Sequence, residues 1–207
     1  IRVGTFQYVA ARDKGDELEI FLDYVVKRHY PELVNSRNKA LDLLNVLIDK
    51  QIDLVINWMR VGFIHGVMNT DNMSILGLTI DYGPFSFMET YDPSFICNHS
   101  DTQGRYSFER QPSVALWNLQ RLAYTLESLI QEDRLKDALS SYEKILVKEY
   151  SYLMRSKFGL ILQDEGDNSL INNFLELLYT NQKDYHRSMR MLLNQKENLL
   201  GDSFESW

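Results

Sequence analysis

The chain has 207 residues, of which 44% are hydrophobic and 25% charged, a composition typical of a globular protein with a buried core. Its formal net charge of -7 argues against a general nucleic-acid-binding protein, which needs a basic face to neutralise phosphates. No apolar run approaches the about 20 residues that a membrane helix requires, so no membrane partner is expected. The single cysteine, Cys97, excludes an internal disulfide.

The N-terminal segment begins at Ile1, and no basic-then-apolar leader follows it, so no signal peptide is expected. Weak alternation of apolar residues over 1–11 predicts a short strand or an extended lead-in. The sequence Asp13-Lys14-Gly15-Asp16 predicts a turn that caps the following helix.

Apolar residues recur at intervals of three and four in six further segments, which predicts amphipathic helices. The segments are 17–29, 39–60, 114–131, 135–157, 169–180 and 182–198. Pro31 ends the first of them, and the breadth of the apolar stripe on the second predicts a central position in the core.

Residues 61–111 differ in composition from the rest of the chain. They hold five of the ten glycines and two of the four prolines, together with many polar residues. This composition predicts loops and short strands, with a small hairpin formed by 74–78 and 78–81. Functional residues often lie in such a loop region when helices hold it rigidly.

The order of polar residues in this region is that of a protein-kinase active site. The loop His65–Asn72 is followed by Asp81-Tyr82-Gly83, as a kinase catalytic loop is followed by Asp-Phe-Gly. An amide oxygen from Asn72 and the carboxylate of Asp81 are hard ligands that suit Mg²⁺ on nucleotide phosphates. Taken alone, each short motif is also a common turn sequence.

One position departs from the kinase pattern. Val67 stands where the catalytic aspartate is expected, two residues after His65, and a valine side chain cannot accept a proton. Asp71, directly before Asn72, is the nearest carboxylate that can serve as a base instead. His65 itself is given a structural role.

Longer strings carry a more specific resemblance. They are His65–Phe85, Phe95–Asp101 with Gly104-Arg105-Tyr106, Gln111-Pro112 leading into Ala115–Ala123, and the opening Ile1–Phe6. Together these strings resemble the selenoprotein O family. The resemblance is strong over 1–125 and weaker afterwards, where Asp184-Tyr185 is a late match.

The resemblance implies a protein-kinase-like fold and a protein adenylyltransferase activity. Residues 1–207 would form a single region of α+β class, predominantly α, equivalent to the kinase C-lobe, with the active-site segment at 61–111 and helices over 112–207. ATP would bind flipped relative to ordinary kinases, so that AMP passes to Ser, Thr or Tyr hydroxyls of protein substrates. Asn72 and Asp81 would bind Mg²⁺, with Mn²⁺ as the alternative; Asp71 would act as base and Arg2 would contact the nucleotide phosphates.

The resemblance also implies parts that this sequence lacks. A glycine-rich loop, a strand lysine and its helix glutamate would precede Ile1, and a C-terminal tail with a cysteine or selenocysteine would follow. We therefore expect a fragment that binds ATP poorly and is inactive alone, without the redox bridge that the family implies for Cys97. The family occurs in bacterial cytoplasm and in mitochondria.

Three alternatives remain open at this stage. Ordinary phosphoryl transfer is disfavoured by Val67, and a non-catalytic pseudokinase binding module is disfavoured by the surviving Asn72 and Asp81. A metal hydrolase built on His99 and Asp101 together with the loop aspartates lacks a recognisable ligand spacing. We expect the segment from Asn98 to Asp101 to brace the loop after Asp81 instead.

Overall fold

The computed structural model describes residues 1–12 and 16–194 and is predominantly helical. The helices are α1 (Val3–Arg12), α2 (Asp16–His29), α3 (Lys39–Arg60), α4 (Gln111–Thr125), α5 (Glu132–Phe158), α6 (Asp167–Thr180) and α7 (Tyr185–Asn194). Short 3₁₀ helices span Pro31–Leu33, Thr70–Asn72 and Phe108–Arg110. None of the helices within the described ranges has an apolar stretch that would span a bilayer.

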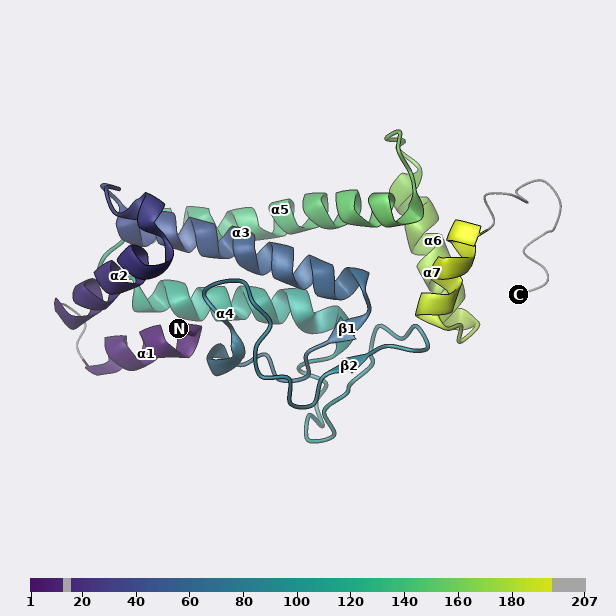
Figure 1. The fold of residues 1–207 in the computed structure, drawn as a ribbon, viewed down its shortest axis with the longest axis horizontal. Coiled ribbons are helices and arrows are strands. Elements are labelled where there is room, and N and C mark those ends of the chain that lie inside the picture. Colours follow the sequence, from purple (N-terminus) through teal and green to yellow (C-terminus); the bar gives the residue numbers. More distant parts are fainter. Residues whose placement is uncertain (13–15, 195–207) are drawn as a thin grey trace.

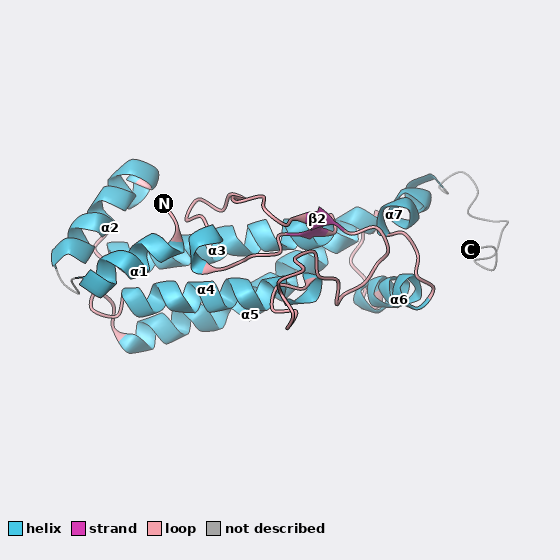
Figure 2. Cartoon of the chain, turned by 90° about the horizontal axis from the view of Figure 1, so that it is seen from below, coloured by secondary structure: helices cyan, strands magenta, loops and turns pink. Residues whose placement is uncertain are grey.

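The long helices α3 and α5 lie side by side with α4 along them, and α1 and α2 cover one end of this layer (Figure 1). The loops of 61–111 run along one side of the bundle (Figure 2). The predicted stripe on α3 is confirmed, since Leu44, Leu47, Val55 and seven further side chains of that helix lie in the main core. A second cluster joins α5, α6 and α7 at the opposite end.

The helix predictions for 17–29, 39–60, 135–157 and 169–180 are confirmed to within three residues at each end. The helix predicted over 114–131 instead ends at Thr125, and the chain turns before α5 begins. Residues 195–198 of the last predicted helix, and most of the turn predicted at Asp13–Asp16, lie outside the described residues.

The predicted strand over 1–11 is wrong, because Val3–Arg12 is helix α1. Val3 and Phe6 are buried, and Ala10 packs against the same core, so the apolar residues follow a helical interval and not an alternation. Only Arg2 pairs in an extended manner, in an isolated antiparallel bridge with Ser74.

The predicted hairpin within 74–81 is also wrong. The two-stranded antiparallel sheet is instead formed by β1 (Phe63–Ile64) and β2 (Ser86–Phe87). Within 74–80 the backbone forms only a turn, in which the Gly77 N–H donates to the Ser74 carbonyl, and its other partners lie elsewhere in the fold: Gln51 Nε2 donates to the Ser74 carbonyl over 2.7 Å, and the Tyr30 hydroxyl donates to the Ile75 carbonyl. Because these partners already satisfy the backbone, a hairpin ladder is not needed. The fold class α+β, predominantly α, is confirmed at this level, and the kinase C-lobe assignment stays a prediction.

Candidate active site

The loop between β1 and the 3₁₀ helix Thr70–Asn72 is held by side-chain amides of α4. Gln111, fully buried, donates from Nε2 to the Phe63 carbonyl over 2.9 Å and accepts from the His65 N–H over 3.0 Å. Asn118, equally buried, donates to the Met68 carbonyl over 2.8 Å. Buried backbone groups without partners are costly, so these two side chains fix the loop's path.

Two further amides complete this support. Asn98 donates from Nδ2 to the Gly66 carbonyl over 3.2 Å, and Asn72 donates from Nδ2 to the Val67 carbonyl over 2.9 Å. The bond from Asn72 turns its amide nitrogen towards its own loop and leaves Oδ1 as the free end of a buried side chain. The residue predicted as a metal ligand therefore has a fixed orientation with an oxygen available.

The supporting role of Gln111 and Asn118 was not predicted from the sequence. Their signal in the sequence was present: each is an amide in a helix whose neighbouring positions Val114, Ala115 and Leu119 are buried and apolar. A buried amide in such a stripe needs hydrogen-bond partners, and here the partners are loop carbonyls.

Gly66 allows the loop to pass close to the next segment. Its φ is +81°, and a Cβ there would lie 2.7 Å from Cys97 Sγ and 3.1 Å from Pro84 Cγ. An L side chain would be strained by this φ and would also collide with its neighbours. The half-buried thiol of Cys97, whose pKa is raised mainly by burial, therefore packs directly against the loop.

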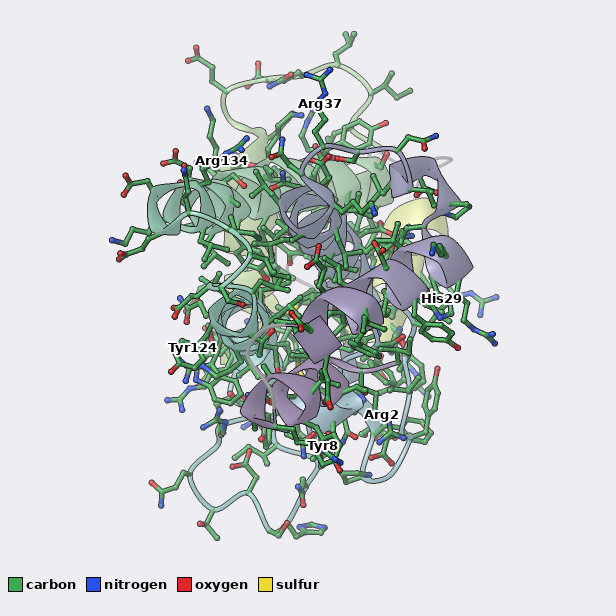
Figure 3. All side chains as sticks on the ribbon, turned by 90° about the vertical axis from the view of Figure 1, so that its left-hand side faces the viewer. Arg2, Tyr8, His29, Arg37, Tyr124 and Arg134 are labelled. Carbon is green, nitrogen blue, oxygen red and sulfur yellow. The ribbon has the colours of Figure 1, made fainter. Side chains whose placement is uncertain are left out.

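Asp71 lies against the first turn of α1. A Cβ on Gly4 would be 2.1 Å from Asp71 Oδ1, so only a glycine leaves room for this carboxylate. The Val3 N–H donates to the Met73 carbonyl over 3.0 Å, and the Arg2–Ser74 bridge lies beside it. The N-terminal end of a helix favours a nearby anion. The structure thus brings Arg2 and Asp71, both exposed, to one region, and Figure 3 shows Arg2 at the α1 end of the molecule.

His65 connects the loop to the segment that carries Asp81. Its Nε2 donates to the Ile80 carbonyl over 2.7 Å, and its Nδ1 accepts from the Val67 N–H over 3.3 Å. Burial lowers the pKa of His65, which favours the neutral ring that this pattern requires. The structural role predicted for His65 is confirmed.

Asp81 itself is exposed and adopts a φ of +58°, while its carbonyl accepts from the Gly83 N–H over 2.8 Å. A non-glycine residue in this region is uncommon and is often found at functional sites. Asn72 Oδ1 and the Asp81 carboxylate are both hard oxygen donors, and neither is committed to an ion pair within the described residues. The donor chemistry fits a magnesium ion.

The metal-hydrolase alternative finds no support in the described residues. Over 1–12 and 16–194, no three His, Cys, Asp or Glu side chains come together in a way that could hold a metal. The carboxylate of Asp101 accepts from the backbone N–H groups of Arg105 and Tyr106 over 2.9 and 2.8 Å. These two bonds brace the loop after Asp81, as predicted, and the bond from Asn98 to the Gly66 carbonyl also joins the segment to the loop before Asn72.

The family model described as "Protein adenylyltransferase SelO" matches residues 1–206. The chain belongs to the SelO family. The resemblance over the loop strings is thereby confirmed, and it extends beyond the 1–125 segment in which the motifs are dense.

Relatives named "Protein nucleotidyltransferase YdiU" are similar over most of the chain. The protein of Enterobacter sp. (strain 638) is 47% identical over 192 residues, which are 93% of this chain and 40% of the relative. That of Pelagibacter ubique (strain HTCC1062) is 47% identical over 201 residues, 94% of this chain and 42% of the relative. That of Klebsiella pneumoniae (strain 342) is 44% identical over 197 residues, 95% of this chain and 41% of the relative. The chain therefore spans about two fifths of the length of these SelO-family relatives.

Proposed function

We propose that this SelO-family chain contributes the metal-binding and base residues of a protein adenylyltransferase, which transfers AMP from ATP to Ser, Thr or Tyr hydroxyls of proteins. The observation that carries the proposal is the arrangement of the loop from Phe63 to Asn72. Side-chain amides hold its backbone, Val67 occupies the usual base position, and the exposed carboxylate of Asp71 lies at the N-terminal end of α1.

In this proposal Asn72 Oδ1 and the Asp81 carboxylate hold Mg²⁺, which supplies charge neutralisation at the phosphates when bound. Arg2, whose backbone pairs with Ser74 two positions after Asn72, offers forked N–H donors to phosphate oxygens. His65 and Gln111 act as positioning residues because they fix the backbone on which both ligands are carried.

Asp71 accepts the proton of the acceptor hydroxyl as that oxygen bonds to the α-phosphorus of ATP. The bond from the α-phosphorus to the bridging oxygen breaks, and pyrophosphate leaves. An exposed carboxylate with access to an incoming protein side chain suits this role. Transfer of the α-phosphoryl group distinguishes this reaction from that of an ordinary kinase.

Calorimetry of ATP binding, with and without Mg²⁺, tests the metal ligands. Asn72→Ala and Asp81→Ala should each abolish the Mg²⁺-dependent part of the binding, whereas Asp137→Asn, an exposed carboxylate on α5, should leave it unchanged. We measure the chain itself and a chimaera in which residues 1–206 replace the matching segment of the Enterobacter relative. No Mg²⁺-dependent binding by either protein would refute an ATP site and favour a non-catalytic binding module.

Transfer is followed in the chimaera with ATP labelled at the α- or the γ-phosphate. We expect protein-bound label from the α-phosphate alone, reduced by about 10²-fold or more in Asp71→Asn. Label from the γ-phosphate would overturn the proposal in favour of phosphoryl transfer. Full transfer by Asp71→Asn would refute the assigned base while leaving AMP transfer intact. We also expect the 207-residue chain alone to be inactive, so transfer by that chain would refute this second expectation.

A further inference from the structure

A groove of about 700 Å³ lies between the segment after β2 and the C-terminal end of α6. Its walls include Phe87, Glu89, Tyr91, Asp92, Phe95 and Tyr179. Figure 1 shows the chain after β2 extending towards α6 and α7, at the end of the molecule away from α1 and α2. The catalytic and metal-binding residues proposed above do not line this groove.

The inner wall of the groove is fixed by backbone pairing and by aromatic stacking. The Tyr91 N–H donates to the Lys183 carbonyl over 2.9 Å, and the Tyr185 N–H donates to the Glu89 carbonyl over 2.7 Å. The Tyr91 and Tyr185 rings stack with centroids 5.7 Å apart. Because these contacts hold the wall in place, a ligand would enter a preformed groove and lose little free energy in ordering it.

The outer wall exposes two large aromatic rings. Phe87 is 53% exposed and Tyr179 is 47% exposed. The Phe87 ring lies beside the rings of Phe63 and His186, with centroids 5.4 and 6.5 Å away, and about half of its surface remains exposed. Exposed rings beside a groove offer flat surfaces on which a guanidinium or an extended peptide can stack.

The charges of the groove have one sign. Its lining includes the carboxylates Glu89 and Asp92 and no Lys or Arg side chain. Tyr91 lies in the same negative field. Its pKa is raised to about 12, mainly by burial and further by the nearby carboxylates of Glu109 and Glu176. A negatively charged surface with exposed rings is complementary to a cationic side chain.

Lys183 is the cation nearest in sequence to this wall. Its backbone carbonyl forms part of the wall, but its side chain lines a separate depression on α6 together with Phe174 and Leu178. The neighbouring Arg187 is paired with Asp184 over 3.9 Å. Neither cation is among the lining residues, so the field of the carboxylates is not neutralised within the groove.

We propose that this groove docks an arginine- or lysine-bearing extended segment of the protein substrate, next to the hydroxyl that receives AMP. The inference rests on the proposed function and names the substrate feature that the site would recognise. Phe87 follows Asp81 by six positions, so the two residues lie at most about 20 Å apart even when the chain between them is fully extended. A peptide of about seven residues can therefore reach from the groove to the proposed metal ligand.

A second copy of this chain is a poorer occupant. In a two-fold symmetric contact the same patch meets itself, so Glu89 and Asp92 of both copies would come together. Like charges in such a contact are repelled. An incoming nucleic acid is disfavoured for the same reason, because its phosphates carry the sign of the groove.

The test measures peptide binding without ATP, so that its failure is distinct from failure of AMP transfer. The probes are three fluorescein-labelled nine-residue peptides that share one serine and differ in carrying two arginines, two glutamines or two glutamates. Their binding to the chain is followed by fluorescence anisotropy at 50 and 200 mM salt. The double variant Glu89→Gln/Asp92→Asn removes both charges and keeps the Asp92 oxygen that accepts from the Ser94 N–H. Glu127→Gln/Glu143→Gln, away from the groove, is the matched control.

We expect the arginine peptide to bind most tightly and to weaken about tenfold in the groove variant, with no change in the control variant. Its affinity should fall at 200 mM salt, because ions screen exposed charges. Tyr179→Ala should weaken the same peptide several-fold through loss of stacking. Equal binding of the three peptides, an equal loss in the control variant, or a dimer that Tyr179→Ala dissociates would overturn the proposal.

Discussion

Replacing Gln111 with methionine should destabilise the protein by removing the support of the loop from Phe63 to Asn72. The variant keeps the length of the side chain and removes both of its polar atoms. The Phe63 carbonyl then loses its donor and the His65 N–H loses its acceptor, while both residues are at least 96% buried. Each buried backbone group left without a partner costs about 1–3 kcal/mol.

The two losses together amount to about 2–6 kcal/mol, from which the greater apolar surface of methionine recovers about 1 kcal/mol. We therefore expect the free energy of unfolding to fall by about 1–5 kcal/mol, a sizeable share of the about 5–15 kcal/mol typical of a domain. Urea titration followed by circular dichroism measures this change. The melting temperature should fall by about 2–20 °C.

Gln120→Met on the same helix is the matched control, since Gln120 is exposed. Its effect should lie within about 0.5 kcal/mol of zero. If the free energy of unfolding changed as little in Gln111→Met as in this control, the amide support of the loop would have no energetic importance and the reasoning would be refuted. A further readout is Mg²⁺-dependent ATP binding, which should weaken in Gln111→Met and not in Gln120→Met.

Three other substitutions test local features of the same framework. Gly66→Ala should cost about 2–4 kcal/mol in urea unfolding, and adding Cys97→Ala should recover only part of it because the φ of +81° remains; full recovery would show that the clash alone matters. Burial lowers the pKa of Lys157 to about 8, from an ordinary value of 10.5. Between these two pH values the unfolded chain binds more protons than the folded one, so the free energy of unfolding rises with pH. Urea titrations at pH 7.5, 8.5 and 9.5 should show this rise in the wild type and its absence in Lys157→Met; identical pH profiles would contradict it. Tyr30→Phe should lose about 1–2 kcal/mol because the Ile75 carbonyl loses its buried donor, and a loss within error of zero would argue that another donor replaces it.

The sequence by itself determined the helices whose apolar stripes are long and regular. The apolar stripe on α3 predicted the helix and both of its ends, Lys39 and Arg60. Over 22 residues an apolar spacing of three and four excludes the alternation of a strand. The order of Asn72 and Asp81 within a long contiguous string predicted them as metal ligands, and that assignment stays a prediction. The family assignment followed from the same string.

Only the tertiary structure decided the elements that depend on partners distant in sequence. Over 1–11 a short apolar pattern fits strand or helix, and packing of Val3 and Phe6 against the core selected the helix. Ser74 pairs with Arg2 instead of forming a hairpin, because α3 and the N-terminal segment supply partners for its backbone.

The support of the active-site loop is likewise a tertiary property. Gln111 lies 48 residues from Phe63 and Asn118 lies 50 residues from Met68, so no local pattern specifies which carbonyl each amide reaches. The groove beside α6 joins residues that are about 90 positions apart, Phe87 and Tyr179 among them. Sequence fixes which side chains are available, whereas packing of the helices determines which buried polar groups meet and therefore which orientation each site residue has.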